Sequence, residues 1–372
     1  MSRWREHKTP TLPLIDKCVN VAGTTAEGWH LRSNMSEASP TRIIYALCRM
    51  LCKARCNAKV VAASIAFQPP KPPFYEVTVK SKEGRDEKLL EDEYSVVLRD
   101  EIDELVSPIL RSGSIKREVH VVKTKTGGTV PLFLFRVKKA RATIFYSHGN
   151  ATDLGAMTPR FLEMCQNLSV NVCGYDYSGY GSSQGAAATE QQVYYDAKAA
   201  FQYLVDVCQI KLSEIIIYGQ SVGSGPSIYL ATKYECLGLI LHSGLLSGLR
   251  VLTPNRCCLC CCDIFPNIDR IPKVKCPTFV IHGLQDSQIH VSHGMGLYER
   301  IPDKLKVEPW FVEGADHNNI VYSNFRPYFW KMRQFIDKIS SKGKNSDDKL
   351  DNSSSSNFNA GSVFPGTGNE KV

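Results

Sequence analysis

The sequence lacks any long uncharged apolar run. None of its 372 residues lies in a stretch that approaches the ~20 consecutive apolar residues of a membrane-spanning helix. The opening MSRWREHKTP has no apolar core of the kind that a secretory signal carries, so we expect no signal peptide here. Any membrane attachment is therefore expected to be peripheral or covalent, and the 14 cysteines are expected to be reduced thiols of a cytosolic protein.

A strong excess of one charge is also missing. Lys and Arg number 45 and Asp and Glu 37, a formal net charge of +8, and no basic segment is interleaved with aromatic residues. We therefore expect no nucleic-acid partner. Carboxylates are absent from residues 41–60, where five basic side chains gather, and this composition is typical of a segment at a membrane surface.

Both ends of the chain lack the hydrophobic period of a folded segment, and the C-terminal end is also poor in bulky apolar residues. Residues 1–40 have no hydrophobic period, and residues 341–372 are rich in Ser, Asn, Gly and Lys. Such segments bury too little apolar surface to fold, so we expect an unstructured N-terminal extension and a disordered tail. Between them we predict a Cys-rich basic membrane-anchoring segment at residues 41–68 and one α/β domain at residues 69–340.

The central part of the chain alternates strand-like and helix-like segments. REVHVVKT and TVPLFLFRV are typical of a hairpin, and later apolar runs such as ATIFYSHGN, EIIIYGQ and TFVIHG end in glycine or polar turns. Helix-length segments, among them EQQVYYDAKAAFQYLVDVC and YFWKMRQFIDKI, separate or follow them. This alternation predicts an α/β fold with a mostly parallel sheet and helices on both faces. Ligands bind such sheets at the carboxyl ends of the strands.

Three candidate catalytic residues follow predicted strands. Ser221 lies in Gly-Gln-Ser-Val-Gly, the pattern of a nucleophile on a strand-to-helix turn. Asp286 and His317 come later, in the chain order Ser, acid, His that α/β hydrolases use. A serine hydroxyl is a poor nucleophile unless a base accepts its proton and an acid orients that base, so we predict that these three residues form a triad.

An oxyanion hole beside this serine needs two backbone N–H donors. One is expected from Val222, directly after the serine, and the other from the loop that follows His148. Asn150 is the first choice for the second donor, and its neighbour Ala151 is the alternative.

Other titratable residues are alternatives within the triad. For the acid, Asp176 precedes the serine in the chain and so has the wrong order, and Asp316 would have to reach back to its own neighbour. For the base, His290 and His293 follow the predicted acid and remain alternatives. We expect His242, like His148, to satisfy backbone groups rather than take part in the chemistry.

Six linked motifs carry a family resemblance. SHGNATDLGAM, YDYSGYGSSQG, YGQSVGSGPS, IHGLQD, LYERIP and EGADHN resemble those of the α/β-hydrolase domain-containing protein 17 family of membrane-bound serine hydrolases. The resemblance implies an α/β-hydrolase fold with a small lid, and a protein depalmitoylase that cleaves the thioester between a fatty acyl chain and a cysteine of a membrane-attached protein. The family triad carries over to Ser221, Asp286 and His317. A carboxylesterase or lipase would use the same groups, whereas a non-catalytic scaffold would usually lack one of them.

This chain departs from the usual family pattern in two loops. Leu284 and Gln288 stand where the family usually has a small and an apolar residue. Asp316 replaces the usual glycine before the predicted base and adds a carboxylate there. We expect the triad to survive these changes while substrate preference and pH dependence differ.

Cysteines recur at every fourth position in ALCRMLCKARC, as Cys48, Cys52 and Cys56. In a helix they would lie along one stripe. Family members carry an acylated cysteine cluster at the corresponding end, so the resemblance implies that protein acyltransferases modify these three residues; a short helix with buried cysteines is the alternative. Two or more acyl chains anchor a protein stably. We therefore expect a peripheral protein on the cytosolic face of the plasma or endosomal membrane, with S-acylated membrane proteins as substrates.

A second cluster, Cys257 to Cys262 in RCCLCCCDIF, has five thiols in six residues. This spacing differs from the paired cysteines of a zinc site, so we expect no metal and no cofactor. The cluster lies where the fold places its lid. A second acylated or membrane-contacting patch is one interpretation of these cysteines.

Overall fold

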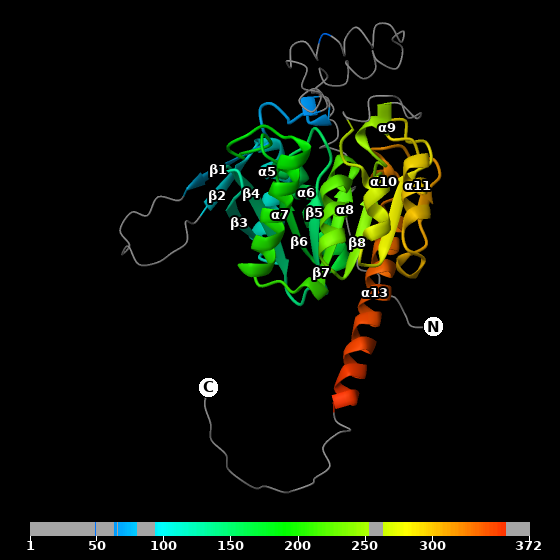
Figure 1. Ribbon diagram of the computed structural model, residues 1–372. Helices are drawn as coiled ribbons and strands as arrows, with labels where there is room; N and C mark the ends of the chain where they lie inside the picture. Colours follow the sequence, from blue (N-terminus) through cyan, green and yellow to red (C-terminus); the bar gives the residue numbers. More distant parts are fainter. Residues whose placement is uncertain (1–48, 50–62, 65, 80–93, 253–262, 355–372) are drawn as a thin grey trace, which may run out of the picture.

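An eight-stranded sheet forms the centre of the molecule, with the strand order β10-β9-β8-β7-β5-β6-β4-β3 (Figure 1). The computed structural model describes residues 49, 63–64, 66–79, 94–252 and 263–354, with side chains as far as residue 341. The strands are β3 (Ile115–Lys123), β4 (Thr129–Val137), β5 (Thr143–Ser147), β6 (Asn171–Tyr175), β7 (Ile215–Gln220), β8 (Gly238–His242), β9 (Thr278–Gly283) and β10 (Trp310–Val312).

The sheet is mostly parallel. β3 and β4 form the predicted antiparallel hairpin, β4 also pairs antiparallel with β6, and the remaining neighbours run parallel from β6 to β10. The central strands β5, β8 and β9 are buried along their whole length, as is β7 up to its last residue. Strands buried on both faces have continuous apolar runs, which explains the Ile-Ile-Ile-Tyr sequence of β7. The predicted α/β-hydrolase fold is confirmed.

Helices cover both faces of the sheet. They are α5 (Asp100–Arg111), α6 (Leu154–Leu168), α7 (Glu190–Asp206), α8 (Ser224–Lys233), α9 (Gly248–Leu252), α10 (Asn267–Arg270), α11 (Ser292–Arg300), α12 (Ile320–Ser323) and α13 (Phe325–Ser354), with 3-10 turns at Leu212–Glu214, Ser221–Gly223, Ile271–Lys273 and Asp303–Leu305. One apolar cluster holds Phe201 of α7 and Ile228 of α8, and another holds Phe161 of α6 and Phe335 of α13. The sheet is thus covered as the sequence predicts.

A separate two-stranded sheet, which the sequence analysis did not predict, consists of β1 (Tyr75–Val79) and β2 (Tyr94–Leu98). It extends from the edge of the molecule near β3 in Figure 1. Its buried end positions Phe74 and Tyr75 against the start of α6, because the Phe74 N–H donates to Asp153. The segment that leads into this small sheet is therefore tied to the start of α6.

The last helix is longer than its apolar pattern indicates. The apolar period of α13 ends near Ile339, but the helix runs to Ser354, into the segment predicted to be a tail (Figure 1). Adding a residue to an existing helix costs far less than starting one, so a helix can continue past the end of its apolar period. The apolar period therefore does not mark the end of this helix.

Several predictions fall outside the described residues. These are the N-terminal extension, Cys48, Cys52, Cys56, the cluster from Cys257 to Cys262 in the centre of the predicted lid, and the chain beyond Ser354. Among the helices that are described, none is both long and apolar enough to span a bilayer. Within the same ranges, no three His, Cys, Asp or Glu side chains are arranged to hold a metal ion.

Candidate active site

The candidate residues gather at the carboxyl edge of the sheet. Ser221 directly follows β7, Asp286 lies in the loop after β9, and His317 lies in the loop after β10. The loop that begins at His148 follows β5, the neighbour of β7. Because these strands are parallel, their carboxyl ends meet on one edge, and four segments far apart in the sequence come together there.

Ser221 stands on a strained turn between β7 and α8. Its φ is 54°, in the left-handed region that non-glycine residues rarely adopt. A Cβ atom at Gly223 would lie 2.1 Å from the carbonyl oxygen of Ser147, and one at Gly219 would lie 2.7 Å from the carbonyl oxygen of Gly223. The backbones approach so closely that both glycines are required, which gives the Gly-Gln-Ser-Val-Gly pattern a structural reason.

His317 contacts both of its predicted partners. Its Nε2 lies 3.0 Å from Ser221 Oγ, and its Nδ1 lies 2.7 Å from Asp286 Oδ2. An ionised carboxylate can only accept a hydrogen bond, so Nδ1 carries the proton in the neutral ring and Nε2 presents its lone pair to the serine hydroxyl. In this arrangement His317 is placed to take the serine proton.

Asp286 is buried and held by four donors. Its Oδ1 accepts from the N–H groups of Gln288 at 2.9 Å and Ile289 at 2.8 Å. Its Oδ2 accepts from His317 and lies 3.2 Å from His282 Nε2. Burial alone would raise the pKa of Asp286, but the hydrogen bonds from His282 and His317 hold the pKa below its usual range. Asp286 therefore stays ionised beside His317.

The alternative bases have other partners. His293 Nδ1 accepts from the Leu246 N–H at 3.0 Å, and burial lowers its pKa to about 4. His290 is exposed, and its Nδ1 lies 2.9 Å from Ser292 Oγ. Among the described residues neither ring is hydrogen-bonded to Ser221, in contrast to His317.

His242 is not tied to backbone groups as expected. Its Nδ1 lies 2.5 Å from the hydroxyl of Tyr218, a side chain of the neighbouring strand. Burial lowers the pKa of His242 to about 3, so the ring is neutral. The sequence expectation was wrong because strand pairing, which it did not resolve, brings β7 and β8 side chains together.

The alternative acids also have other partners. Asp316 Oδ1 accepts from the N–H groups of Asn318 and Asn319 at 2.8 and 2.9 Å, which closes a local turn. Asp176 accepts from the Tyr75 hydroxyl at 2.5 Å and from the Leu154 N–H at 3.2 Å. Asp176 therefore connects β1 and the start of α6.

The loop expected to carry the oxyanion donor runs beside the serine. A Cβ atom at Gly149 would lie 3.7 Å from the Cβ of Ser221. The Asn150 side-chain oxygen accepts from the Tyr180 hydroxyl at 2.6 Å and from the N–H groups of Gln68 and Ala151, each at 2.9 Å. Because the Ala151 N–H is used in this way, Asn150 remains the first choice for the second donor. The role of Val222, which is buried directly after Ser221, also stays a prediction.

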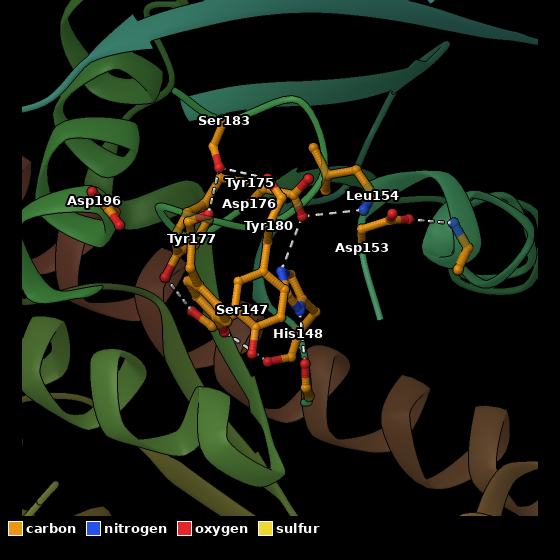
Figure 2. Close-up of polar contacts among 12 residues, drawn as sticks. Ser147, His148, Asp153, Leu154, Tyr175, Asp176, Tyr177, Tyr180, Ser183 and Asp196 are labelled. Atoms are coloured by element: carbon orange, nitrogen blue, oxygen red, sulfur yellow. Dashed lines mark hydrogen bonds and ion pairs between the residues drawn. The ribbon is translucent and has the colours of Figure 1, made fainter. Parts of the chain in front are cut away.

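A buried polar network supports this loop, as Figure 2 shows. His148 Nδ1 lies 2.8 Å from the carbonyl oxygen of Gly149, its Nε2 lies 3.1 Å from Asp176 Oδ1, and the Tyr177 hydroxyl donates to its backbone oxygen at 2.6 Å. Thus His148 satisfies backbone groups as expected and also pairs with Asp176. The network fixes the loop from both sides.

Asp153 belongs to the same network and caps α6. Its two carboxylate oxygens accept from the N–H groups of Phe74 at 2.7 Å and Ala156 at 3.0 Å. Burial, reinforced by the nearby carboxylate of Asp176, raises the pKa of Asp153 to about 6. Sequence reasoning missed Asp153 and His282, although an Asp just before a helix and a His four residues before the candidate acid were visible signals.

The chain is similar to known serine hydrolase families and proteins. The sequence model of a family described as serine aminopeptidase, S33, matches residues 138–259. The chain is 37% identical over 292 residues to the alpha/beta hydrolase domain-containing protein aho-3 of Caenorhabditis elegans, which covers 78% of this chain and 82% of that protein. It is 36% identical over 291 residues to the alpha/beta hydrolase domain-containing protein 17B of Homo sapiens, with coverage of 78% and 95%.

Among solved structures, the Pyrococcus furiosus esterase Pf2001 is similar in fold. It superposes with a TM-score of 0.51 at 18% identity, over 62% of this chain and 95% of the esterase. At that identity the likeness concerns the fold alone, and it agrees with the parallel sheet and its flanking helices.

Proposed function

Because this chain belongs to the alpha/beta hydrolase domain-containing protein 17 family and is an α/β serine hydrolase, we propose that it is a thioesterase that removes palmitoyl or other long acyl chains from cysteines of membrane-attached proteins. The observation that carries this proposal is the contact of His317 with both Ser221 and Asp286, at 3.0 and 2.7 Å. The family relationship suggests acylated proteins as the substrate class. The arrangement of Ser221, His317 and Asp286 supports hydrolysis through an acyl-enzyme.

In the first half of the reaction, Ser221 Oγ attacks the thioester carbonyl carbon while His317 Nε2 accepts the hydroxyl proton. The carbon–sulfur bond then breaks, and the cysteine sulfur leaves with the proton that His317 returns. The acyl chain remains on Ser221 as an ester. Asp286 stays ionised and stabilises the protonated imidazole throughout this step.

In the second half, water replaces the thiol. Water gives a proton to His317 Nε2 and attacks the ester carbonyl, and the proton then returns to Ser221 Oγ as the fatty acid leaves. The negative charge on the carbonyl oxygen in both halves is stabilised by the N–H groups of Val222 and Asn150, each worth on the order of 3 kcal/mol in the transition state.

Access to acylated membrane proteins is part of the proposal. Acylation of Cys48, Cys52 and Cys56 would place the enzyme on the membrane surface that carries its substrates. Three acyl sites among basic residues suffice for stable attachment without a membrane-spanning helix.

The test compares two matched substrates with the purified protein. One is a peptide with an S-octanoyl cysteine, and the other is the same peptide with an O-octanoyl serine. We expect faster hydrolysis of the thioester, and the Ser221→Ala variant should hydrolyse neither. A clear preference for the oxygen ester would favour a carboxylesterase or lipase, and equal rates for wild type and Ser221→Ala would favour a non-catalytic scaffold.

A further inference from the structure

A pocket of about 150 Å³ lies beside the candidate triad. Gln220 and Asn318, the chain neighbours of Ser221 and His317, both line it. Its other walls come from Phe74, Thr152, α5, α6, α12, α13 and the ends of β5, β7 and β8, and include Tyr146, Arg160, Tyr218, His242, Tyr322 and Tyr328. The mechanism above uses none of these six side chains.

Arg160 is the one charged residue among those that line the pocket. It is only 9% exposed, and its guanidinium lies over the Tyr322 ring at 5.4 Å. Its Nη1 is 3.1 Å from Glu163 Oε2, an ion pair without hydrogen-bond geometry. Within the described part of the chain, the Arg160 guanidinium donates no hydrogen bond. A buried guanidinium with unused N–H groups has room for an oxygen acceptor.

The tyrosine hydroxyls around Arg160 are already paired. The Tyr218 hydroxyl contacts His242 Nδ1 at 2.5 Å and the Tyr328 hydroxyl at 2.8 Å, and the Tyr146 hydroxyl donates to Gln220 Oε1 at 2.6 Å. Burial raises the pKa of Tyr328 to about 12, so this hydroxyl is neutral. The tyrosines therefore offer aromatic surface to a ligand, while Arg160 offers the unused donors.

Charge balance favours a neutral ligand. The carboxylate of Glu163, itself only 3% exposed, already faces the positive charge of Arg160. A second carboxylate would leave one negative charge unbalanced in a buried site, which is costly. A carbonyl oxygen can accept a hydrogen bond from the guanidinium without this cost.

Size decides which side of the substrate fits. A cavity of about 150 Å³ holds a ligand of the size of benzene, so a palmitoyl chain is far too large for this pocket. An amide with its two flanking carbons is of the right size, and the tyrosine rings can pack on its flat faces. The size of the pocket therefore favours a small part of the leaving group over the full acyl chain.

We propose that this pocket binds a backbone amide of the acylated peptide, with Arg160 donating to its carbonyl oxygen, and so favours S-acyl peptides over small thioesters. The inference rests on the proposed thioesterase function and names its leaving-group site. Arg160 is then a specificity residue, which binds the substrate on the far side of the bond that Ser221 breaks.

The test uses two octanoyl thioesters that differ only in the thiol. One carries N-acetylcysteine methylamide and the other carries propanethiol, which has no amide. The readout is the ratio of kcat/KM for the two substrates. A general loss of activity affects both substrates and cancels in this ratio. The difference in intrinsic reactivity between the two thioesters is the same for every variant, so it cancels when the ratios of two proteins are compared. We expect the kcat/KM ratio, amide substrate over propanethiol substrate, to be about tenfold or more higher in wild type than in a variant that lacks the Arg160 donor.

The donor is removed without leaving a buried charge unpaired by combining Arg160→Met with Glu163→Met. Replacing a buried ion pair by apolar residues of similar volume is often neutral for stability. The ratio should fall about tenfold in this double variant, whereas the matched control Glu163→Gln, which keeps the guanidinium, should retain it. Should the double variant not fold, Arg160→Lys keeps the charge opposite Glu163, loses the planar fork of donors, and should lower the ratio in the same direction.

Two results would overturn the inference. The first is an unchanged ratio in the folded double variant or in Arg160→Lys. The second is a change in the preference for octanoyl over acetyl chains with no change in the leaving-group ratio, which would make the pocket an acyl site. If wild type cleaved neither thioester through Ser221, the proposed function itself would fail, a result distinct from both.

Discussion

His282 Nε2 lies 3.2 Å from the Asp286 oxygen that also accepts from His317. The same nitrogen lies 2.7 Å from the backbone oxygen of Ile289, so both of its neighbours are acceptors and it must carry a proton. The ring is fully buried. His282 is therefore a positioning residue, which fixes the carboxylate that orients the base.

Replacing His282 tests this arrangement through a pH profile. In His282→Leu the Asp286 pKa should rise, because a donor to the carboxylate is lost, and kcat/KM should fall about tenfold. Since Asp286 then takes up a proton at a higher pH, activity should decline at a higher pH on the acidic side. His282→Gln, whose amide can donate from a similar position, should lie close to wild type. Coincident acidic limbs for His282→Leu and wild type would contradict the coupling.

The choice of base is tested by three alanine variants. His317→Ala should lower turnover by about 10³ or more, because the serine loses the group that accepts its proton. His293→Ala and His290→Ala should change turnover little, since their rings are bonded to Leu246 and Ser292. Steady-state hydrolysis of the octanoyl peptide measures all three. A larger loss of turnover in His293→Ala than in His317→Ala would identify His293 as the base instead.

Asp153 predicts a dependence of stability on pH. Burial raises its pKa to about 6, so folding favours the protonated form. The free energy of unfolding should therefore fall as pH rises from about 4, the unfolded pKa, to about 6, by on the order of 3 kcal/mol. The side chain of Asp153→Asn cannot titrate. The difference in melting temperature between wild type and Asp153→Asn should therefore change between about pH 4 and about pH 6. A constant difference from pH 4 to pH 7 would show that Asp153 does not titrate there.

Membrane attachment can be separated from catalysis. Replacing Cys48, Cys52 and Cys56 together by Ser removes the predicted acyl sites but keeps the basic side chains, each worth about 1 kcal/mol near an anionic surface and weakened by salt. The triple variant should move to the soluble fraction and cleave a small thioester as well as wild type, yet fail on membrane-bound acylated proteins. Continued membrane binding in high salt would place the anchor elsewhere, with the cluster from Cys257 to Cys262 as the next candidate.

The sequence predicted those parts of the site that depend on local pattern. Ser221 was found because the turn requires Gly219 and Gly223, and Asp286 and His317 were found because each follows a predicted strand in the chain order Ser, acid, His. The parallel strands were found from their apolar runs, and the hairpin of β3 and β4 was found from two successive strand-like segments.

The sequence did not predict contacts between distant segments. The Gln68 N–H reaches Asn150, and the Phe74 N–H reaches Asp153, across more than seventy positions of the chain. The pocket around Arg160 likewise combines α6, α12 and α13. No period in the sequence encodes such pairs, because they are set by how the elements pack.

The most direct test of whether Ser221 removes acyl chains from membrane proteins measures S-acylation in cells. Acyl-biotin exchange across the membrane proteome compares cells that express wild type with cells that express Ser221→Ala at equal levels. We predict that wild type lowers the S-acylation of a set of membrane proteins. In cells with Ser221→Ala, the S-acylation of these proteins should equal that in cells without the protein. Equal S-acylation in wild-type and Ser221→Ala cells, with both proteins present on the membrane, would contradict this prediction.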